Sequence, residues 1–210
     1  MSRTSTEIDA QTLRDVDPRM SPCSVDLYWI PVAAGTPWLQ RASLRWWEWF
    51  EAMRCRRPRA TLFHSALKII DDRGRKSTLE LAPAFLGDDP PPVATGPVAF
   101  RGADRIRLLR YHFRWMPVER LPDEAWAVGE PVHLTDNCLI LNRIIELAPR
   151  LPRLVWGRHA PGTDEMWTSD SAISWLLECA GIDLSGVHPP PGGRAPGWYA
   201  GIAWAHRVAG

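Results

Sequence analysis

A capped apolar helix is encoded in the stretch Met166-Trp-Thr-Ser-Asp-Ser-Ala-Ile-Ser-Trp-Leu-Leu-Glu-Cys-Ala-Gly181. Hydroxyl and carboxyl groups precede the apolar run, and Thr168, Ser169 or Asp170 can each accept a hydrogen bond from the first free amides of a helix that starts near residue 171. The apolar positions cover a wide arc, which predicts a buried helix, and Gly181 suits the position after its end. A hydroxyl at the mouth of a buried helix fits a nucleophile, and it fits plain capping too.

A hairpin is predicted upstream, in Thr61-Leu-Phe-His-Ser-Ala-Leu-Lys-Ile-Ile70 and Ser77-Thr-Leu-Glu-Leu81, joined by a turn at Asp71-Asp-Arg-Gly74. His64 lies on its first strand and Glu80 on its second. A nucleophile, a general base and a residue that orients the base are the parts of acyl-transfer catalysis. We therefore predict His64 as the base and Glu80 as its orienting acid.

Other segments extend this core. In Ile106–Trp115 the aromatic residues alternate toward one face, which places His112 with the arginines at a solvated rim. Cys138 falls in the first turn of a helix that Thr135 or Asp136 can cap; helix amides there can lower a cysteine pKa, or the residue can simply be small and buried. The remaining predicted elements are a strand over 25–32, a helix over 38–54, a helix over 139–148 and a last short strand over 199–204.

Composition limits the class of protein. The 210 residues, 45% of them hydrophobic, suit a polar arm over residues 1–24 and a single α+β domain over 25–210. A net charge of +1 argues against nucleic-acid and membrane partners. The polar N-terminus shows no signal segment, and the four cysteines show no metal-ligand spacing, so we expect a reduced, cytoplasmic protein without metal or cofactor.

The order of these parts resembles the circularly permuted papain-like group, which includes the NlpC-like amidases and the lecithin retinol acyltransferase-like enzymes. The resemblance rests on a strand like Asp26-Leu-Tyr-Trp-Ile-Pro-Val32, on His64 beginning the next strand, on Glu80 in the strand after it, and on an Asn137-Cys138 pair that starts a helix. It covers roughly residues 26 to 181. It implies an antiparallel sheet packed against helices, with a permuted papain-like core.

The resemblance does not decide between two candidate nucleophiles, Cys138 and Ser169. Cys138 has the family's chemistry, whereas Ser169 begins the better helix but offers serine where the family has cysteine. We expect the pocket walls to come from the loops at 83–105 and 150–168. Some short patterns also resemble an uncharacterised bacterial group, which implies no function. The residues predicted to bind substrate are Trp156, Arg158, Trp167, Asp170, Arg194 and Trp198.

The predicted function is that of a hydrolase or acyltransferase acting on an amide, ester or thioester through an acyl-enzyme. Its partner would be a small-molecule or peptide substrate. The alternative is a non-catalytic member of the same fold that binds a ligand or a protein partner. A third possibility is a nucleic-acid binder, which the near balance of acidic and basic residues disfavours. It would use the arginines of the 101–114 region, which are Arg101, Arg105, Arg107, Arg110 and Arg114.

Overall fold

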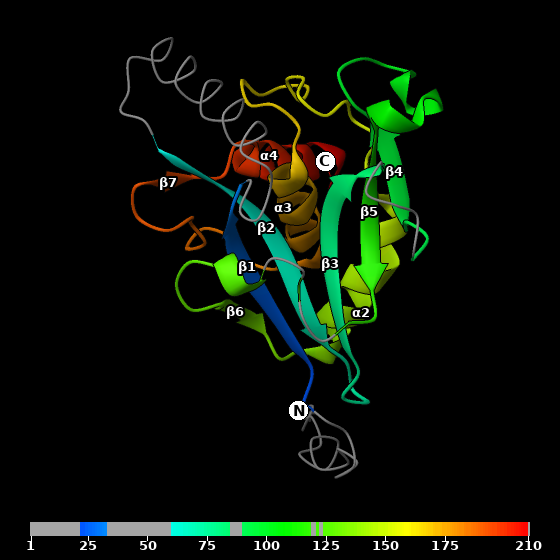
Figure 1. The fold of residues 1–210 in the computed structure, drawn as a ribbon. Helices are drawn as coiled ribbons and strands as arrows, with labels where there is room; N and C mark the ends of the chain where they lie inside the picture. Colours follow the sequence, from blue (N-terminus) through cyan, green and yellow to red (C-terminus); the bar gives the residue numbers. More distant parts are fainter. Residues whose placement is uncertain (1–21, 33–59, 85–89, 119–120, 122–123, 210) are drawn as a thin grey trace, which may run out of the picture.

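The computed structural model describes residues 22–32, 60–84, 90–118, 121 and 124–209, and within these ranges an antiparallel sheet packs against three helices (Figure 1). The α+β class is confirmed. The strands are β1 (Ser24–Pro31), β2 (Thr61–Ile70), β3 (Lys76–Pro83), β4 (Ala94–Pro97), β5 (Arg110–Met116), β6 (Val132–Thr135) and β7 (Gly193–Arg194). The helices are α2 (Cys138–Leu147), α3 (Ser169–Ala180) and α4 (Trp198–Ala209), with short 3₁₀ turns at 103–105, 107–109, 124–126 and 148–150.

The sheet has the strand order β4-β5-β3-β2-β1-β6, and β7 adds a short parallel pair beside β2. The predicted strand at 25–32 is confirmed as β1, and the predicted hairpin as β2 and β3. A tight turn closes that hairpin because Asp71 Oδ1 accepts hydrogen bonds from the backbone amides of Arg73 and Arg75. Gly74 supplies the left-handed conformation that this turn needs.

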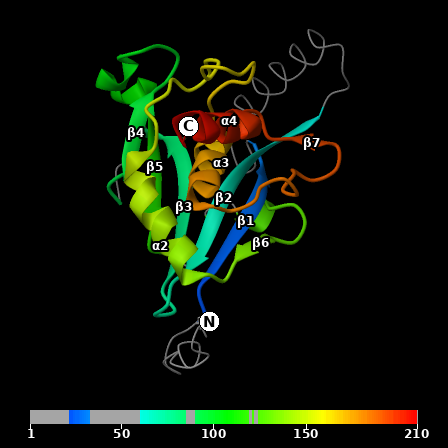
Figure 2. The ribbon, with the colours of Figure 1, turned by 180° about the vertical axis from the view of Figure 1, so that it is seen from behind.

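Strand register defines two faces of the sheet. Leu27 lies opposite Leu67, and Leu67 lies opposite Leu79, so these three side chains share one face. That face carries the main core and is covered by α2, α3 and α4; Figure 2 shows α2 and α4 lying over it. The second face carries the alternate residues, among them Ile30 and Ala66, which form a smaller buried cluster with Leu121.

The helices α3 and α4 approach each other closely because glycine lies between them. A Cβ atom built at Gly201 would be 2.1 Å from the Ser171 carbonyl oxygen and 2.1 Å from Ser174 Oγ. Gly197 is equally confined, with a φ of +87° and a Cβ position 2.4 Å from the Met166 carbonyl oxygen. Both contacts include backbone atoms, so no side chain can be accommodated without moving a helix.

Two sequence predictions, one for residues 199–204 and one for His112, are wrong. Residues 199–204 belong to α4 rather than to a strand, because the buried positions Trp198, Gly201 and Ala205 recur at helical spacing while two of them are too small to register as an apolar stripe. His112 is not at a solvated rim: it is 2% exposed and Arg114 is 6% exposed, because the second face of the sheet is itself buried there.

Smaller differences concern element ends. The strand predicted from residue 106 begins at Arg110, because residues 107–109 form a 3₁₀ turn. The helix predicted over 139–148 is confirmed, but its N-cap is Asn137, whose side chain accepts a hydrogen bond from the Leu139 amide. The predicted helix over 38–54 and most of the predicted arm over 1–24 lie outside the described residues. Among the helices described, none combines the length and the apolar character needed to cross a membrane.

Candidate functional site

The mouth of α3 is a capping structure. Thr168 is the N-cap: its Oγ1 accepts a hydrogen bond from the Asp170 amide at 3.2 Å, and its own amide donates to Ser171 Oγ at 2.9 Å. This reciprocal pair satisfies two amides that the helix leaves unpaired. The hydroxyls of Thr168, Ser171 and Ser174 also donate to the carbonyl oxygens of Pro196, Gly197 and Trp198 at 2.5, 2.7 and 2.7 Å.

Asp170 connects this helix end to the sheet. Its Oδ1 accepts hydrogen bonds from the Ser65 amide at 2.7 Å and from Ser65 Oγ at 2.8 Å, and the carboxyl group is buried, with 2% of the residue exposed. Burial raises the pKa of Asp170 to about 7, although the two hydrogen bonds from Ser65 act to lower it. Asp170 is therefore a buried acid with a raised pKa that links the first turn of α3 to β2.

The predicted base and nucleophile lie on opposite faces of the sheet. Ser65 points toward α3, where its hydroxyl meets Asp170, so its strand neighbour His64 points toward the second face. Glu80 follows Leu79, which faces the main core, and it also belongs to the second face. The structure therefore places His64 and Glu80 on one face and the first turn of α3, with Ser169, on the other.

The second predicted nucleophile, Cys138, is joined to Cys23 by a disulfide bond. The sulfur has no thiolate form in this state, so the prediction of four reduced cysteines is wrong for this pair. The bond connects the residue before β1 to the first turn of α2, across a sequence separation of 115. Disulfides persist in oxidising compartments, so the cytoplasmic location stays a prediction.

Three of the residues predicted to bind substrate lie in the buried core. Trp167 is fully buried, and Trp198 is 2% exposed and packs against Trp29 with ring centroids 5.0 Å apart. Asp170, already described, is the third. Trp156 is half-buried and packs its ring against Tyr111. Arg194 lies in β7, where its backbone pairs with Leu62.

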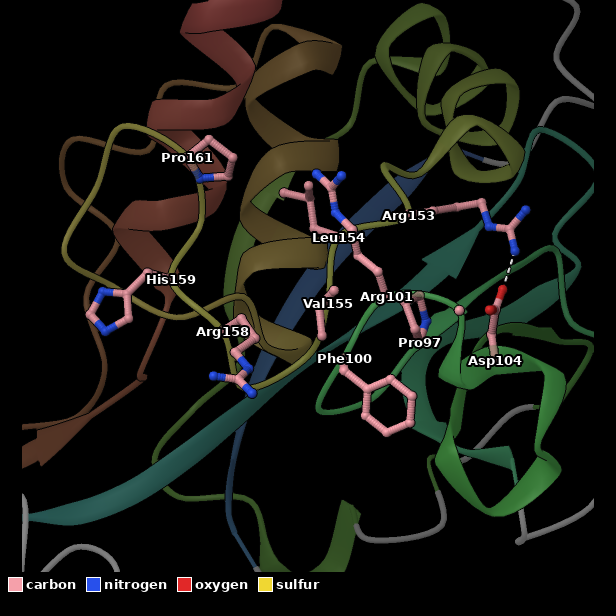
Figure 3. A pocket seen from close by; sticks show the side chains of 11 residues that line it. Pro97, Phe100, Arg101, Asp104, Arg153, Leu154, Val155, Arg158, His159 and Pro161 are labelled. Atoms are coloured by element: carbon pink, nitrogen blue, oxygen red, sulfur yellow. Dashed lines mark hydrogen bonds and ion pairs between the residues drawn. The ribbon is translucent and has the colours of Figure 1, made fainter.

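A cavity of about 560 Å³ lies instead between the segment that follows β4 and the loop that precedes α3. This volume falls in the range of small-molecule sites. Figure 3 shows the lining side chains of both segments, with Arg153 and Asp104 directed toward each other and Arg158 and His159 on the opposite side of the view. The lining falls within the predicted wall loops at 83–105 and 150–168, and it consists of Pro97, Phe100, Arg101, Gly102, Asp104, Arg153, Leu154, Val155, Arg158, His159 and Pro161.

The cavity is electropositive. Asp104 is the only carboxylate among the lining residues, and Arg153 neutralises it through an ion pair. Arg158 uses its Nε to donate to the Ala99 carbonyl oxygen at 2.7 Å, which leaves its two terminal nitrogens for another acceptor. Arg101 makes no hydrogen bond or ion pair with any residue that the structure describes. Two guanidinium groups thus have donors available for a ligand.

The cavity walls are held in place by backbone and tyrosine contacts. The Trp156 amide donates to the Pro97 carbonyl at 2.9 Å, and the Ala99 amide donates back to the Trp156 carbonyl at 3.1 Å. Tyr111 Oη donates to the Leu154 carbonyl at 3.0 Å from the core, where burial raises the Tyr111 pKa to about 12. Ala99 has a φ of 70°, a strained conformation for a residue with a side chain, directly beside the cavity.

Of the residues predicted to bind substrate, only Arg158 lines the cavity. Phe100, Arg153 and His159 were missed as site residues, and Arg101 entered only as a candidate for nucleic-acid contact. The signal that could have found them is the density of arginine in two turn-rich loops. In the described ranges no three His, Cys, Asp or Glu side chains gather in a group able to hold a metal ion.

Comparison of the chain with protein-family models, with curated proteins and with solved structures gives no match. The residues and their geometry are therefore the basis for assigning a function.

Proposed function

We propose that this protein binds a small anionic ligand with an apolar body in the cavity between residues 97–104 and 153–161. The observation that carries the proposal is that Arg101 and Arg158, from segments more than 50 residues apart, both line this cavity with donors that no described carboxylate occupies. Arginine binds carboxylate and phosphate groups through paired hydrogen bonds. Phe100, Val155 and Pro161 supply apolar wall for the rest of the ligand.

Phenyl phosphate is a suitable probe because it joins a dianion to a flat apolar ring. We expect it to bind more tightly than inorganic phosphate, which lacks the ring, and than phenol, which lacks the charge. Arg101→Ala should weaken binding by about tenfold or more, since a hydrogen bond to a charged group contributes roughly 1.5–3 kcal/mol. Isothermal titration calorimetry measures both comparisons.

Arg73→Ala is the matched control, because Arg73 lies in the exposed turn between β2 and β3 and outside the cavity. Its affinity for phenyl phosphate should equal that of the wild type. Equal affinity of the wild type and Arg101→Ala, or binding of phenol as tightly as phenyl phosphate, would contradict the proposal.

Acyl transfer on a permuted papain-like core is the second proposal. One observation favours it: the first turn of α3 lies against β2, where Ser65, the neighbour of His64, bonds to Asp170, the neighbour of Ser169. The sheet stands between the two candidate side chains, however, and a general base must come within hydrogen-bond reach of the proton that it removes. Ligand binding is therefore the first proposal.

A fluorophosphonate probe separates the two proposals because it reacts covalently with activated serines. We expect no phosphonylation of Ser169 in the folded protein, since it is 7% exposed and separated by the sheet from His64. Mass spectrometry of the digested protein detects the adduct, with Ser185, an exposed serine, as the reference for background labelling. Labelling at Ser169 that disappears in His64→Ala would instead make acyl transfer the leading function.

A further inference from the structure

The segment 98–109, which connects β4 to β5, exposes an unusual set of apolar side chains. Phe100 is 52% exposed, Ile106 is 54% exposed and Leu108 is 68% exposed, all within nine residues. Figure 1 shows this segment projecting beyond the ends of β4 and β5. Single exposed apolar residues are ordinary on protein surfaces, whereas a group of large ones on one projection indicates an interaction site.

Arginines alternate with these apolar residues along the segment. Arg101, Arg105 and Arg107 are all exposed. Neither Arg101 nor Arg105 makes an ion pair with a residue that the structure describes, and Asp104, the one acidic residue of the segment, is paired with Arg153. The segment therefore carries a local positive charge, although the chain as a whole has a net charge of only +1.

The exposed side chains stand on a fixed backbone. Ala103 is buried beneath the segment, and its carbonyl accepts a hydrogen bond from the Ile106 amide at 2.9 Å. The Leu109 amide donates to the Ile106 carbonyl at 2.9 Å, and Arg110 Nε donates to the Asp104 carbonyl at 2.7 Å. The backbone that carries the apolar side chains is thus held by hydrogen bonds before any partner binds, which lowers the entropy cost of docking.

We propose that the segment 98–109 docks this protein on the surface of an anionic phospholipid bilayer. Ile106 and Leu108 would enter the boundary of the acyl chains, and Arg101 and Arg105 would bind the lipid phosphates. Aliphatic side chains suit acyl chains, whereas a single-stranded nucleic acid needs aromatic faces for stacking and finds only Phe100. The near-zero net charge that argued against a membrane averages over the whole chain, and binding depends on the local charge.

Co-sedimentation with vesicles tests the proposal. We expect the protein to bind vesicles of phosphatidylcholine with about 30% phosphatidylserine, to bind pure phosphatidylcholine much less, and to be released by high salt. Replacing both Ile106 and Leu108 by serine should weaken binding by more than about tenfold, because two buried aliphatic side chains are lost. Arg105→Gln should weaken it by about fivefold.

Two control variants match these changes. Leu139→Ser removes a side chain that is 78% exposed on α2, away from the segment, and Arg73→Gln removes an exposed charge from the turn between β2 and β3. Both should bind vesicles as the wild type does. The proposal is overturned if the wild type does not co-sediment with the anionic vesicles. It is also overturned if the variant with serine at 106 and 108 binds these vesicles as tightly as the wild type does.

The docking surface is separable from the cavity. Arg105, Ile106 and Leu108 do not line the cavity, so their variants should keep the wild-type affinity for phenyl phosphate. Arg101 serves both features and is therefore left out of the vesicle test. If these variants lose vesicle binding and keep the wild-type affinity for phenyl phosphate, the result supports membrane docking by the segment 98–109. If the wild type does not bind phenyl phosphate, the vesicle test still decides the docking proposal.

Discussion

Replacing both Cys23 and Cys138 by alanine is expected to lower the free energy of unfolding by about 4 kcal/mol. The disulfide closes a loop with a sequence separation of 115, and a cross-link over so long a loop restricts the unfolded chain strongly. It also attaches the start of β1 to the first turn of α2. Urea unfolding of the oxidised wild type and of the double variant, followed by circular dichroism, measures the difference.

Two comparisons establish that the bond itself is responsible. Treatment of the wild type with a reductant should lower its unfolding midpoint to that of the double variant, and the same treatment should leave the double variant unchanged. Cys179→Ala is the matched control, because Cys179 is the free cysteine of the described chain. Identical unfolding of the oxidised and reduced wild type would show that the disulfide does not stabilise this protein.

Replacing Asp170 by asparagine is expected to stabilise the protein at about pH 8, by on the order of 4 kcal/mol, and to change little below about pH 4. Burial raises the pKa of Asp170 to about 7 from an ordinary value of 3.8. An acid with a raised pKa holds its proton more tightly in the folded state, so the wild type loses stability as pH rises from about 4 to 7. Asparagine is neutral throughout, and its oxygen can still accept the hydrogen bonds from Ser65.

Unfolding curves in urea across this pH range provide the measurement. Asp183→Asn is the control of opposite sign, because hydrogen bonds from the Ser185 backbone and side chain lower the pKa of Asp183. The Asp183→Asn variant should be no more stable than the wild type at high pH. A variant at Asp170 that is less stable than the wild type at about pH 8 would show that the start of α3 and Ser65 hold this residue as a carboxylate in the folded protein.

Much of the secondary structure could be predicted from local patterns. Apolar and aromatic runs bounded by turn residues identified β1 and the β2–β3 hairpin, and polar caps before apolar runs identified α2 and α3. The patterns failed for α4, since a helix whose buried positions include glycine and alanine carries little periodic signal. They also failed for His112, because a strand pattern describes one buried face and cannot tell whether the other face is covered.

The candidate site could be predicted less well. The cavity lining falls within the two turn-rich loops that were predicted as pocket walls, and Arg158 is the one predicted binding residue in it. The predicted triad depended on side chains from distant elements meeting at one point. A single step along β2 separates Ser65, which faces α3, from His64, which faces away, and no pattern within one element shows which side a helix will cover.

Local sequence was therefore sufficient to define where most strands and helices lie and how their ends are capped, because periodicity and capping involve neighbours within a few residues. The pairing of Cys23 with Cys138, the raised pKa of Asp170 and the cavity between residues 97–104 and 153–161 required the folded chain. Each of them depends on groups separated by dozens of residues, and on burial that only the packing of helices on the sheet creates.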